Sequence, residues 1–188
     1  MKIVVTGTSG GIGGAVARAA RAAGHSVVDV NRADFAREGE LVREDGVDAV
    51  VFATGVCPVA PLSKTDDELL VETFRVNCAL FARLMRELAA GGRFSPSGAK
   101  AIAVSSVSAT EGWPGGVAYC ASKGALSAVC RAMDAELRGR GVRVVAVEPR
   151  YVKTAMFDGC AGRMGVPASA AEAPEAFAER ILALLCGK

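Results

Sequence analysis

The chain has 188 residues, 51% of them hydrophobic and 22% charged, with a formal net charge of +2. This length suits one domain with a sizeable core, so we expect a single domain over residues 1–188. No block of Lys or Arg forms a stripe suited to a phosphate backbone, and no apolar run approaches the roughly 20 residues that span a bilayer. The totals argue against nucleic-acid and membrane partners.

The cysteines and the histidine limit the kinds of disulfide and metal site that the chain can form. Six cysteines are scattered without a CxxC pair, which favours reduced thiols over a disulfide framework or a zinc knuckle. With His25 as the single histidine, a multi-histidine metal site is excluded, and we expect no metal. Glycines follow MKIVV too early for the apolar core of a signal peptide. These features predict a cytoplasmic protein.

Strand-like and helix-like segments alternate along the chain. Apolar runs predict strands at residues 2–6, 26–30, 48–54, 99–106 and 142–149. Helices are predicted at about 13–23, 65–90, 118–138 and 174–185, with a short helix in GELVRED (39–45) and an irregular segment at 150–173. Continuous apolar strands with helices between them indicate an α/β fold with a doubly wound parallel sheet.

The turn after the first strand is rich in glycine and reads TGTSGGIG at 6–13. Such a strand-to-helix turn lets the backbone approach a pyrophosphate, while the helix N-terminus offers free N–H groups. Gly7, Gly11 and Gly13 give the spacing GxxxGxG in place of the commoner GxGxxG. A tight turn without a ligand is the alternative interpretation.

The end of the second strand bears on the choice of cofactor. It carries Asn31 and then Arg32, while Asp29 lies two residues before Asn31. An acidic side chain there accepts from a ribose 2′-hydroxyl, whereas an arginine neutralises a 2′-phosphate. We therefore favour NADP(H) over NAD(H), although Arg32 as a solvated loop arginine is the alternative.

The stretch YCASK (119–123) places a phenol beside an ammonium. Tyr119 and Lys123 stand at positions i and i+4 of a predicted helix, and so on one face of it. A neighbouring cation lowers a tyrosine pKa from about 10 toward a range useful for proton transfer. A serine from the pair Ser105-Ser106, at the preceding strand end, can orient a substrate oxygen. This set suits hydride transfer to a carbonyl, with Tyr119 supplying the proton.

The chain resembles the short-chain dehydrogenase/reductase family in the order and spacing of its motifs. The family's TGxxxGIG loop matches residues 6–13, its YxxxK motif matches 119–123, and its PGxVxT segment corresponds to PRYVKT at 149–154. A serine thirteen residues before the tyrosine selects Ser106 over Ser105. An asparagine in the long central helix matches Asn77 in FRVNCALF.

The resemblance implies a Rossmann fold and a role for each matched residue. Tyr119 is the acid/base, Lys123 lowers its pKa and holds the nicotinamide ribose, Ser106 orients the substrate, and Asn77 positions a water that links Lys123 to solvent. The cofactor contacts it implies are Gly7, Ser9, Gly11, Ile12, Gly13, Asn31, Arg32, Asp34, Ala53, Thr54, Gly55, Tyr119, Lys123, Pro149, Val152 and Thr154.

The chain departs from the family in four places. The family's NNAG appears as Phe52-Ala53-Thr54-Gly55, and Arg150 replaces the glycine of PG. The family's third strand is reduced to about Asp34-Phe35 or is missing. The chain also ends in a helix without the final strand, so we expect a short member of the family.

These observations predict an NADP(H)-dependent oxidoreductase that transfers hydride between a nicotinamide and a small carbonyl or alcohol substrate. A cofactor-binding regulator or scaffold with little turnover is the alternative, and the activated phenol favours the enzyme. A homodimer or homotetramer is expected through the helices at 65–90 and 118–138, whose second member is rich in small residues. Trp113 either walls the substrate site or packs in the core or at an interface.

Overall fold

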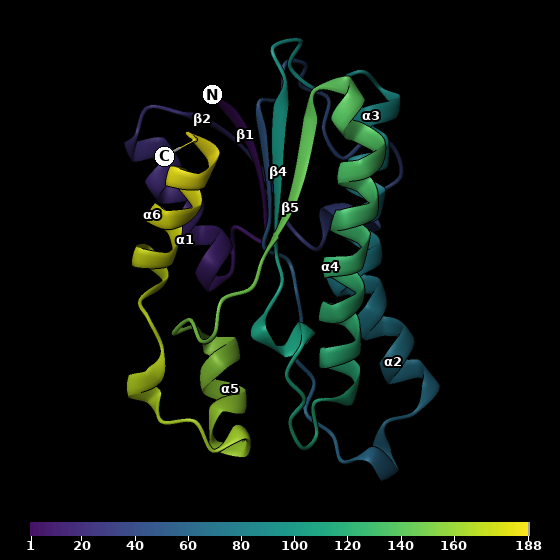
Figure 1. Cartoon of the computed structure of the whole chain (residues 1–188), viewed down its shortest axis with the longest axis vertical. Helices are drawn as coiled ribbons and strands as arrows, with labels where there is room; N and C mark the ends of the chain where they lie inside the picture. The colour runs from purple at the N-terminus through teal and green to yellow at the C-terminus, as the bar shows by residue number, and fades with distance from the viewer. Residues whose placement is uncertain (188) are drawn as a thin grey trace.

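The strands lie in the order β2-β1-β3-β4-β5 and are all parallel. The computed structural model describes residues 1–187 and shows this sheet between two layers of helices (Figure 1). The strands are β1 (Lys2–Thr6), β2 (Ser26–Val30), β3 (Ala49–Phe52), β4 (Ala99–Val104) and β5 (Val142–Val147). The strand order reverses between β1 and β3, where open α/β sheets bind ligands. The predicted doubly wound α/β fold is confirmed.

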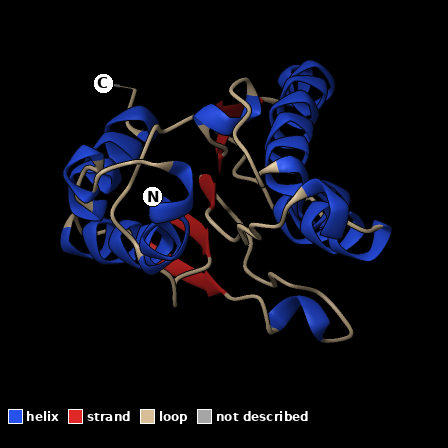
Figure 2. Cartoon of the chain, turned by 90° about the horizontal axis from the view of Figure 1, so that it is seen from below, coloured by secondary structure: helices blue, strands red, loops and turns tan. Residues whose placement is uncertain are grey.

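Two helical layers cover the two faces of the sheet, as the view along the strands shows (Figure 2). One face packs against α1 (Gly11–Ala22) and α6 (Pro174–Leu185) through residues such as Ile3 and Val51. The opposite face, which includes Val4 and Val50, packs against α3 (Leu80–Ala90) and α4 (Val117–Leu137). Successive residues of a strand point to opposite faces, so these apolar runs supply both cores. None of the described helices is long and apolar enough to span a membrane.

The helix predicted at 65–90 is divided by a π-helical turn. It consists of α2 (Asp67–Phe74), the π turn Arg75–Ala79 and α3. Asp66 caps α2, because its carboxylate accepts from the Leu69 N–H at 2.9 Å. A single π turn inside a helix often marks a functional position, and this one contains Asn77.

The prediction of a helix at 39–45 is wrong. Residues 37–48 form turns and extended chain, preceded by a 3₁₀ turn at Asp34–Ala36, so no strand remains at Asp34-Phe35. Side chains of α3 satisfy backbone groups here: Arg83 donates to the Phe35 carbonyl at 2.7 Å, and Glu87 accepts from the Leu41 N–H at 3.2 Å. The segment is held by its neighbour and needs no helix of its own.

The segment expected to be irregular contains a helix, α5 (Ala155–Met164), below the carboxyl ends of the strands (Figure 1). Thr154 caps it by accepting from the Phe157 N–H at 3.2 Å, and Gly165 ends it with φ of +67°. Both signals stand in the sequence. The mixture of apolar and polar residues at 155–164 hides the helical period.

Strand β5 forms one edge of the sheet, and a carboxylate protects it. Asp134 of α4 accepts from the Val144 N–H at 2.9 Å and pairs with Arg143 and Arg138 at 2.8 and 2.6 Å. An N–H occupied in this way is not free to pair with another strand. Ala121 is exposed on the outer side of α4. The homo-oligomer expected to form through this helix stays a prediction.

We expect Asp134→Asn to lower the urea midpoint of unfolding at neutral pH. Hydrogen bonds from Arg143, the Val144 N–H and Arg138 hold the pKa of Asp134 well below its usual range. A carboxyl with a lowered folded-state pKa adds stability above its unfolded pKa of about 3.9 and loses it as the pH falls. The difference between wild type and variant should therefore begin to narrow near pH 4 and continue to narrow as the pH falls further toward the lowered folded-state pKa.

Urea titrations across this pH range measure the effect, with the exposed Glu136→Gln on the same helix as the matched control. A deficit of the same size at every pH would contradict this account.

Candidate active site

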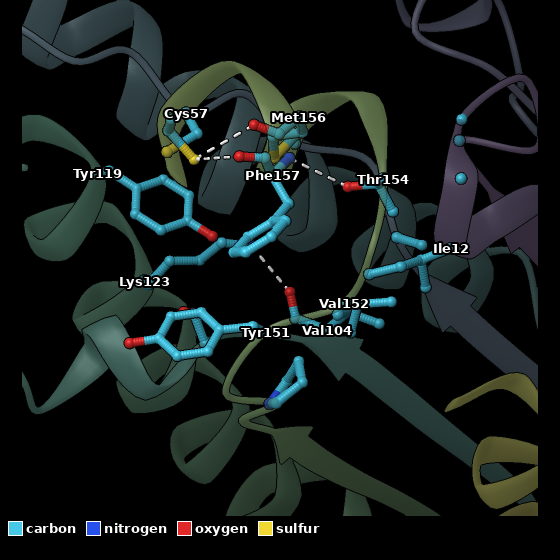
Figure 3. Close-up of a pocket in the computed structure, with 18 of the residues that line it drawn as sticks. Ile12, Cys57, Val104, Tyr119, Lys123, Tyr151, Val152, Thr154, Met156 and Phe157 are labelled. Atoms are coloured by element: carbon cyan, nitrogen blue, oxygen red, sulfur yellow. Dashed lines mark hydrogen bonds between the residues drawn. The ribbon is translucent and has the colours of Figure 1, made fainter. Parts of the chain in front are cut away.

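A cavity of about 370 Å³ opens at the carboxyl ends of β1, β3 and β4 and is roofed by α5 (Figure 3). Four segments that are distant in sequence meet there: the glycine turn, the end of β3, the end of β4 with α4, and residues 149–160. Predicted site residues that line it are Gly7, Ser9, Gly11, Ile12, Arg32, Ala53, Thr54, Gly55, Ser106, Tyr119, Lys123, Pro149, Val152 and Thr154.

The glycine turn leaves no room for side chains at its three key positions. A Cβ on Gly13 would lie 2.3 Å from the Gly7 carbonyl oxygen, and one on Gly11 would lie 2.5 Å from Cγ2 of Thr154. Gly7 has φ of +69°, and a Cβ there would lie 3.0 Å from the Ala53 oxygen. The turn therefore brings the N-terminus of α1 and bare backbone to the cavity. This cradle fits a dinucleotide pyrophosphate.

A threonine pair, Thr6 and Thr54, braces the cradle next to the positions where the family has asparagines. The Thr6 hydroxyl accepts from the backbone N–H groups of Ala53 and Thr54 at 3.1 and 3.2 Å. It also accepts from the Thr54 hydroxyl at 2.9 Å, and both threonines are buried. The ends of β1 and β3 are therefore tied together by side chains despite the departure at 52–55.

Asn31 lies outside the cavity and supports the glycine turn from behind. Its Oδ1 accepts from the Ser9 N–H at 3.0 Å, and its Nδ2 donates to the Thr8 hydroxyl at 3.2 Å. Asp34 also lies outside the cavity lining, where it accepts from the Asn31 N–H at 2.7 Å and pairs with Arg37. These two residues shape the turn after β2.

Arg32 reaches the rim of the cavity. Its guanidinium is exposed and pairs with Glu72 of α2 at 3.1 Å, and Glu72 also binds Arg75 at 2.6 Å. Asp29, the acidic alternative on this strand, pairs with Arg21 on α1 and is absent from the cavity lining. A cation, paired with Glu72, therefore stands at the rim of the cavity beside the end of β2.

Lys123 is almost fully buried at the end of β4. It is 5% exposed, its Nζ donates to the Val104 carbonyl at 2.8 Å, and it lies 5.7 Å from the centre of the Tyr119 ring. Burial lowers the pKa of Lys123 to about 8. Figure 3 shows the lysine chain running beneath Tyr119 to the Val104 oxygen.

The pKa of the Tyr119 phenol differs from the prediction that Lys123 lowers it. Burial raises the pKa of Tyr119 above its ordinary value, and a hydrogen bond with Ser106 opposes that rise without cancelling it. Desolvation of the phenolate outweighs any attraction to the lysine, because Lys123 directs its Nζ to Val104. The phenol is therefore neutral over the ordinary pH range.

The two serines after β4 make different contacts. Ser106 hydrogen-bonds Tyr119 and faces the cavity, while its Oγ accepts from the Ser108 N–H at 3.1 Å. Ser105 instead donates to the Lys123 carbonyl at 3.1 Å and accepts from Ser127 at 3.0 Å. Both serines line the cavity, and Ser105 also joins β4 to α4 through its hydrogen bonds.

Asn77 is fully buried and does not line the cavity. Its Oδ1 accepts from the Val56 N–H at 2.7 Å, and its Nδ2 donates to the Val56 carbonyl and to Ser122 Oγ, both at 2.9 Å. A Cβ on Gly55 would lie 3.2 Å from Asn77 Oδ1 and 3.7 Å from Lys123 Nζ. Asn77 thus clamps the turn after β3 close to the lysine.

Sequence reasoning leaves Phe157 open between a pocket wall and ordinary packing, and it missed the other cavity walls described here. Tyr151 and Phe157 pack with ring centres 5.6 Å apart, and Cys57, Cys160 and Met164 complete the apolar side. No motif marks Cys57, Tyr151, Cys160 or Met164. Cys57 lies in the turn after β3, and the positions on α5 could not be assigned to an inner face because this helix was not predicted.

Two residues that sequence analysis left open have clear positions. Arg150 turns its guanidinium to Glu111 at 2.9 Å, while its residue still lines the cavity. Trp113 packs against the Tyr119 ring, with ring centres 6.4 Å apart, and donates to Ser108 Oγ at 3.1 Å. It lines a neighbouring, more open groove with Val59 and Leu62, so it supports the phenol from outside the cavity.

Known proteins of similar sequence and structure share this architecture. Residues 33–176 match a family model described as enoyl-(acyl carrier protein) reductase. Nodulation protein G of Rhizobium sp. (strain N33) is 28% identical over 84% of this chain and 75% of its own length. L-xylulose reductase of Bos taurus is 31% identical over 82% of this chain and 73% of its length. A solved short chain dehydrogenase/reductase family protein superposes with a TM-score of 0.78 at 26% identity, covering 98% of this chain and 89% of that one.

The chain therefore belongs to the short-chain dehydrogenase/reductase family, a family of NAD(P)-binding oxidoreductases. Its predicted family membership is confirmed.

We expect Asn77→Ala to destabilise the protein by about 1–3 kcal/mol, because it leaves both backbone groups of Val56 without their buried partner. Ser122→Ala is the matched control, since it removes one of the amide's bonds but keeps the clamp on Val56. Urea denaturation compares the two variants. Equal losses would show that the Val56 clamp adds nothing beyond the contact with Ser122.

Proposed function

We propose that residues 1–188 act as one NAD(P)-binding domain that reduces a small carbonyl compound with NADPH, with Tyr119 as the proton donor. One observation carries the proposal: the Ser106–Tyr119 pair and the buried Lys123 face the same cavity as the glycine cradle. A protein that only binds the cofactor has no chemical need for a buried phenol held by a serine. The nicotinamide, when bound, supplies the hydride.

The chain's own residues would supply orientation and the proton. Ser106 donates to the substrate oxygen and holds it near the Tyr119 hydroxyl. The phenol transfers its proton to that oxygen as the carbonyl becomes an alcohol. A raised pKa keeps this phenol protonated at neutral pH, which suits the reductive direction. Lys123, with a pKa of about 8, carries a charge at neutral pH and offsets the negative charge left on the phenolate.

The cavity walls bear on the class of substrate. Tyr151, Met156, Phe157 and Met164 face the cavity from one side, and the nearby Arg150 is engaged by Glu111. These walls favour an uncharged, largely apolar ketone or aldehyde over a carboxylate or phosphate. The modest volume of about 370 Å³ also limits its size once a cofactor shares the space.

We expect Tyr119→Phe to lower kcat/KM for carbonyl reduction by about 10²–10⁴-fold, because the proton donor is removed while the packing of the ring remains. NADPH oxidation with a panel of ketones and aldehydes measures the loss, and NADPH fluorescence tests whether the cofactor still binds. Cofactor binding without turnover in the wild type would favour a regulator or scaffold. Equal turnover by wild type and variant would reject Tyr119 as the donor.

The preference for NADP(H) is proposed from Arg32. Arg32→Ala should raise KM for NADPH by about 10- to 100-fold and change KM for NADH little, because a charged contact to the 2′-phosphate is lost. Steady-state kinetics with each cofactor measure the ratio. Arg37→Ala, which removes an exposed arginine paired with Asp34, is the control. Parallel losses with both cofactors would contradict 2′-phosphate recognition by Arg32.

A further inference from the structure

Three cysteines that are far apart in the sequence surround the Tyr119 phenol. Cys57, Cys120 and Cys160 all act electrostatically on its ionisation, and two of them, Cys57 and Cys160, line the cavity. Cys120 turns away and directs its thiol to the Glu111 carbonyl at 3.7 Å. The pair that faces the cavity is therefore Cys57 and Cys160.

The thiols of Cys57 and Cys160 line the same cavity and are close enough for each to act on the ionisation of the other. Cys57 lies near Tyr119 and Met156 in the cavity (Figure 3), and Met156 belongs to the first turn of α5. Cys160 is 5% exposed, and its Sγ lies 3.2 and 3.4 Å from the carbonyl oxygens of Met156 and Phe157. Two neighbouring thiols at one cavity wall, one from the turn after β3 and one from α5, differ from isolated packing cysteines.

The two cysteines belong to parts of the fold that are held in different ways. Cys57 follows Val56, which Asn77 clamps through both backbone groups, so its position is fixed by the sheet side of the site. Cys160 stands on α5, which carries Met156, Phe157 and Met164 into the cavity. A covalent link between them would join the roof of the cavity to its rigid floor.

We propose that Cys57 and Cys160 form a reversible disulfide that fastens α5 over the cavity and suppresses activity. The oxidant is a small disulfide, RSSR. The Cys57 thiolate attacks one sulfur of RSSR and expels RS⁻, which gives a mixed disulfide. The Cys160 thiolate then attacks Cys57 Sγ and expels the second RS⁻. The protein loses two protons and two electrons, and RSSR becomes two thiols.

The surroundings of the pair determine how it responds. Burial raises the pKa of both thiols, so the thiolate fraction is small at neutral pH and grows with pH. The cross-link should therefore form slowly at neutral pH and about tenfold faster for each unit of rising pH while the thiols remain mostly protonated. Because the reduced pair is not stabilised as thiolate, the disulfide persists once it has formed.

The test uses the full chain with Cys186→Ser, which removes an exposed cysteine, and cystamine as the small disulfide. Peptide mass mapping should find residue 57 linked to residue 160, and dithiothreitol should reverse the link. Proteolysis within residues 155–164 should slow after oxidation, and carbonyl reduction should fall by about tenfold or more. The mapping and the proteolysis need no turnover, so they decide the proposal even if the proposed reductase activity fails.

Matched variants separate this pair from the other thiols. Cys57→Ser and Cys160→Ser should each abolish the cross-link. Each variant should have nearly the same activity before and after treatment with cystamine. Cys120→Ser should still form the link. A link to Cys120 in place of Cys160, a cystamine adduct on Cys57 that Cys160 never resolves, or a cross-link that leaves proteolysis and activity unchanged would each overturn the proposal.

Discussion

The burial of Lys123 is the constraint on which the site depends. An ammonium group taken out of water needs a partner, and the Val104 carbonyl at the end of β4 supplies it. This bond fixes the second turn of α4 over the sheet, and Ser105 reinforces it by donating to the Lys123 carbonyl. The position of Tyr119, one helical turn earlier, and its contact with Ser106 follow from that anchor.

The floor of the site is held by a second buried polar group, Asn77. An amide can donate and accept at once, so one side chain satisfies both backbone groups of Val56 and still reaches Ser122 on α4. The π turn at Arg75–Ala79 places this amide inward at a point where the helix period changes. Asn77 thereby connects the helical layer, the turn after β3 and the helix that carries Tyr119.

The sequence was sufficient for features that are set by local chemistry. The glycine turn, the strands and the pair Tyr119–Lys123 each have a period or spacing that limits the possible structures. It was insufficient where tertiary contacts decide. Arg83 and Glu87 of α3 bond the backbone of Phe35 and Leu41 in the segment before β3, and α5 covers a cavity built by other segments. The direction of the Tyr119 pKa also depends on desolvation, which no spacing reveals.

The two edges of the sheet lie away from the cavity. Among the described residues, β2 and β5 are the edge strands of the five-stranded order. The cavity instead lies at β1, β3 and β4, in the interior of the order. Each edge is covered locally: Phe35 is buried in the same core cluster as Val30 of β2, and Asp134 occupies the Val144 N–H of β5. The five described strands therefore place the candidate site away from both edges.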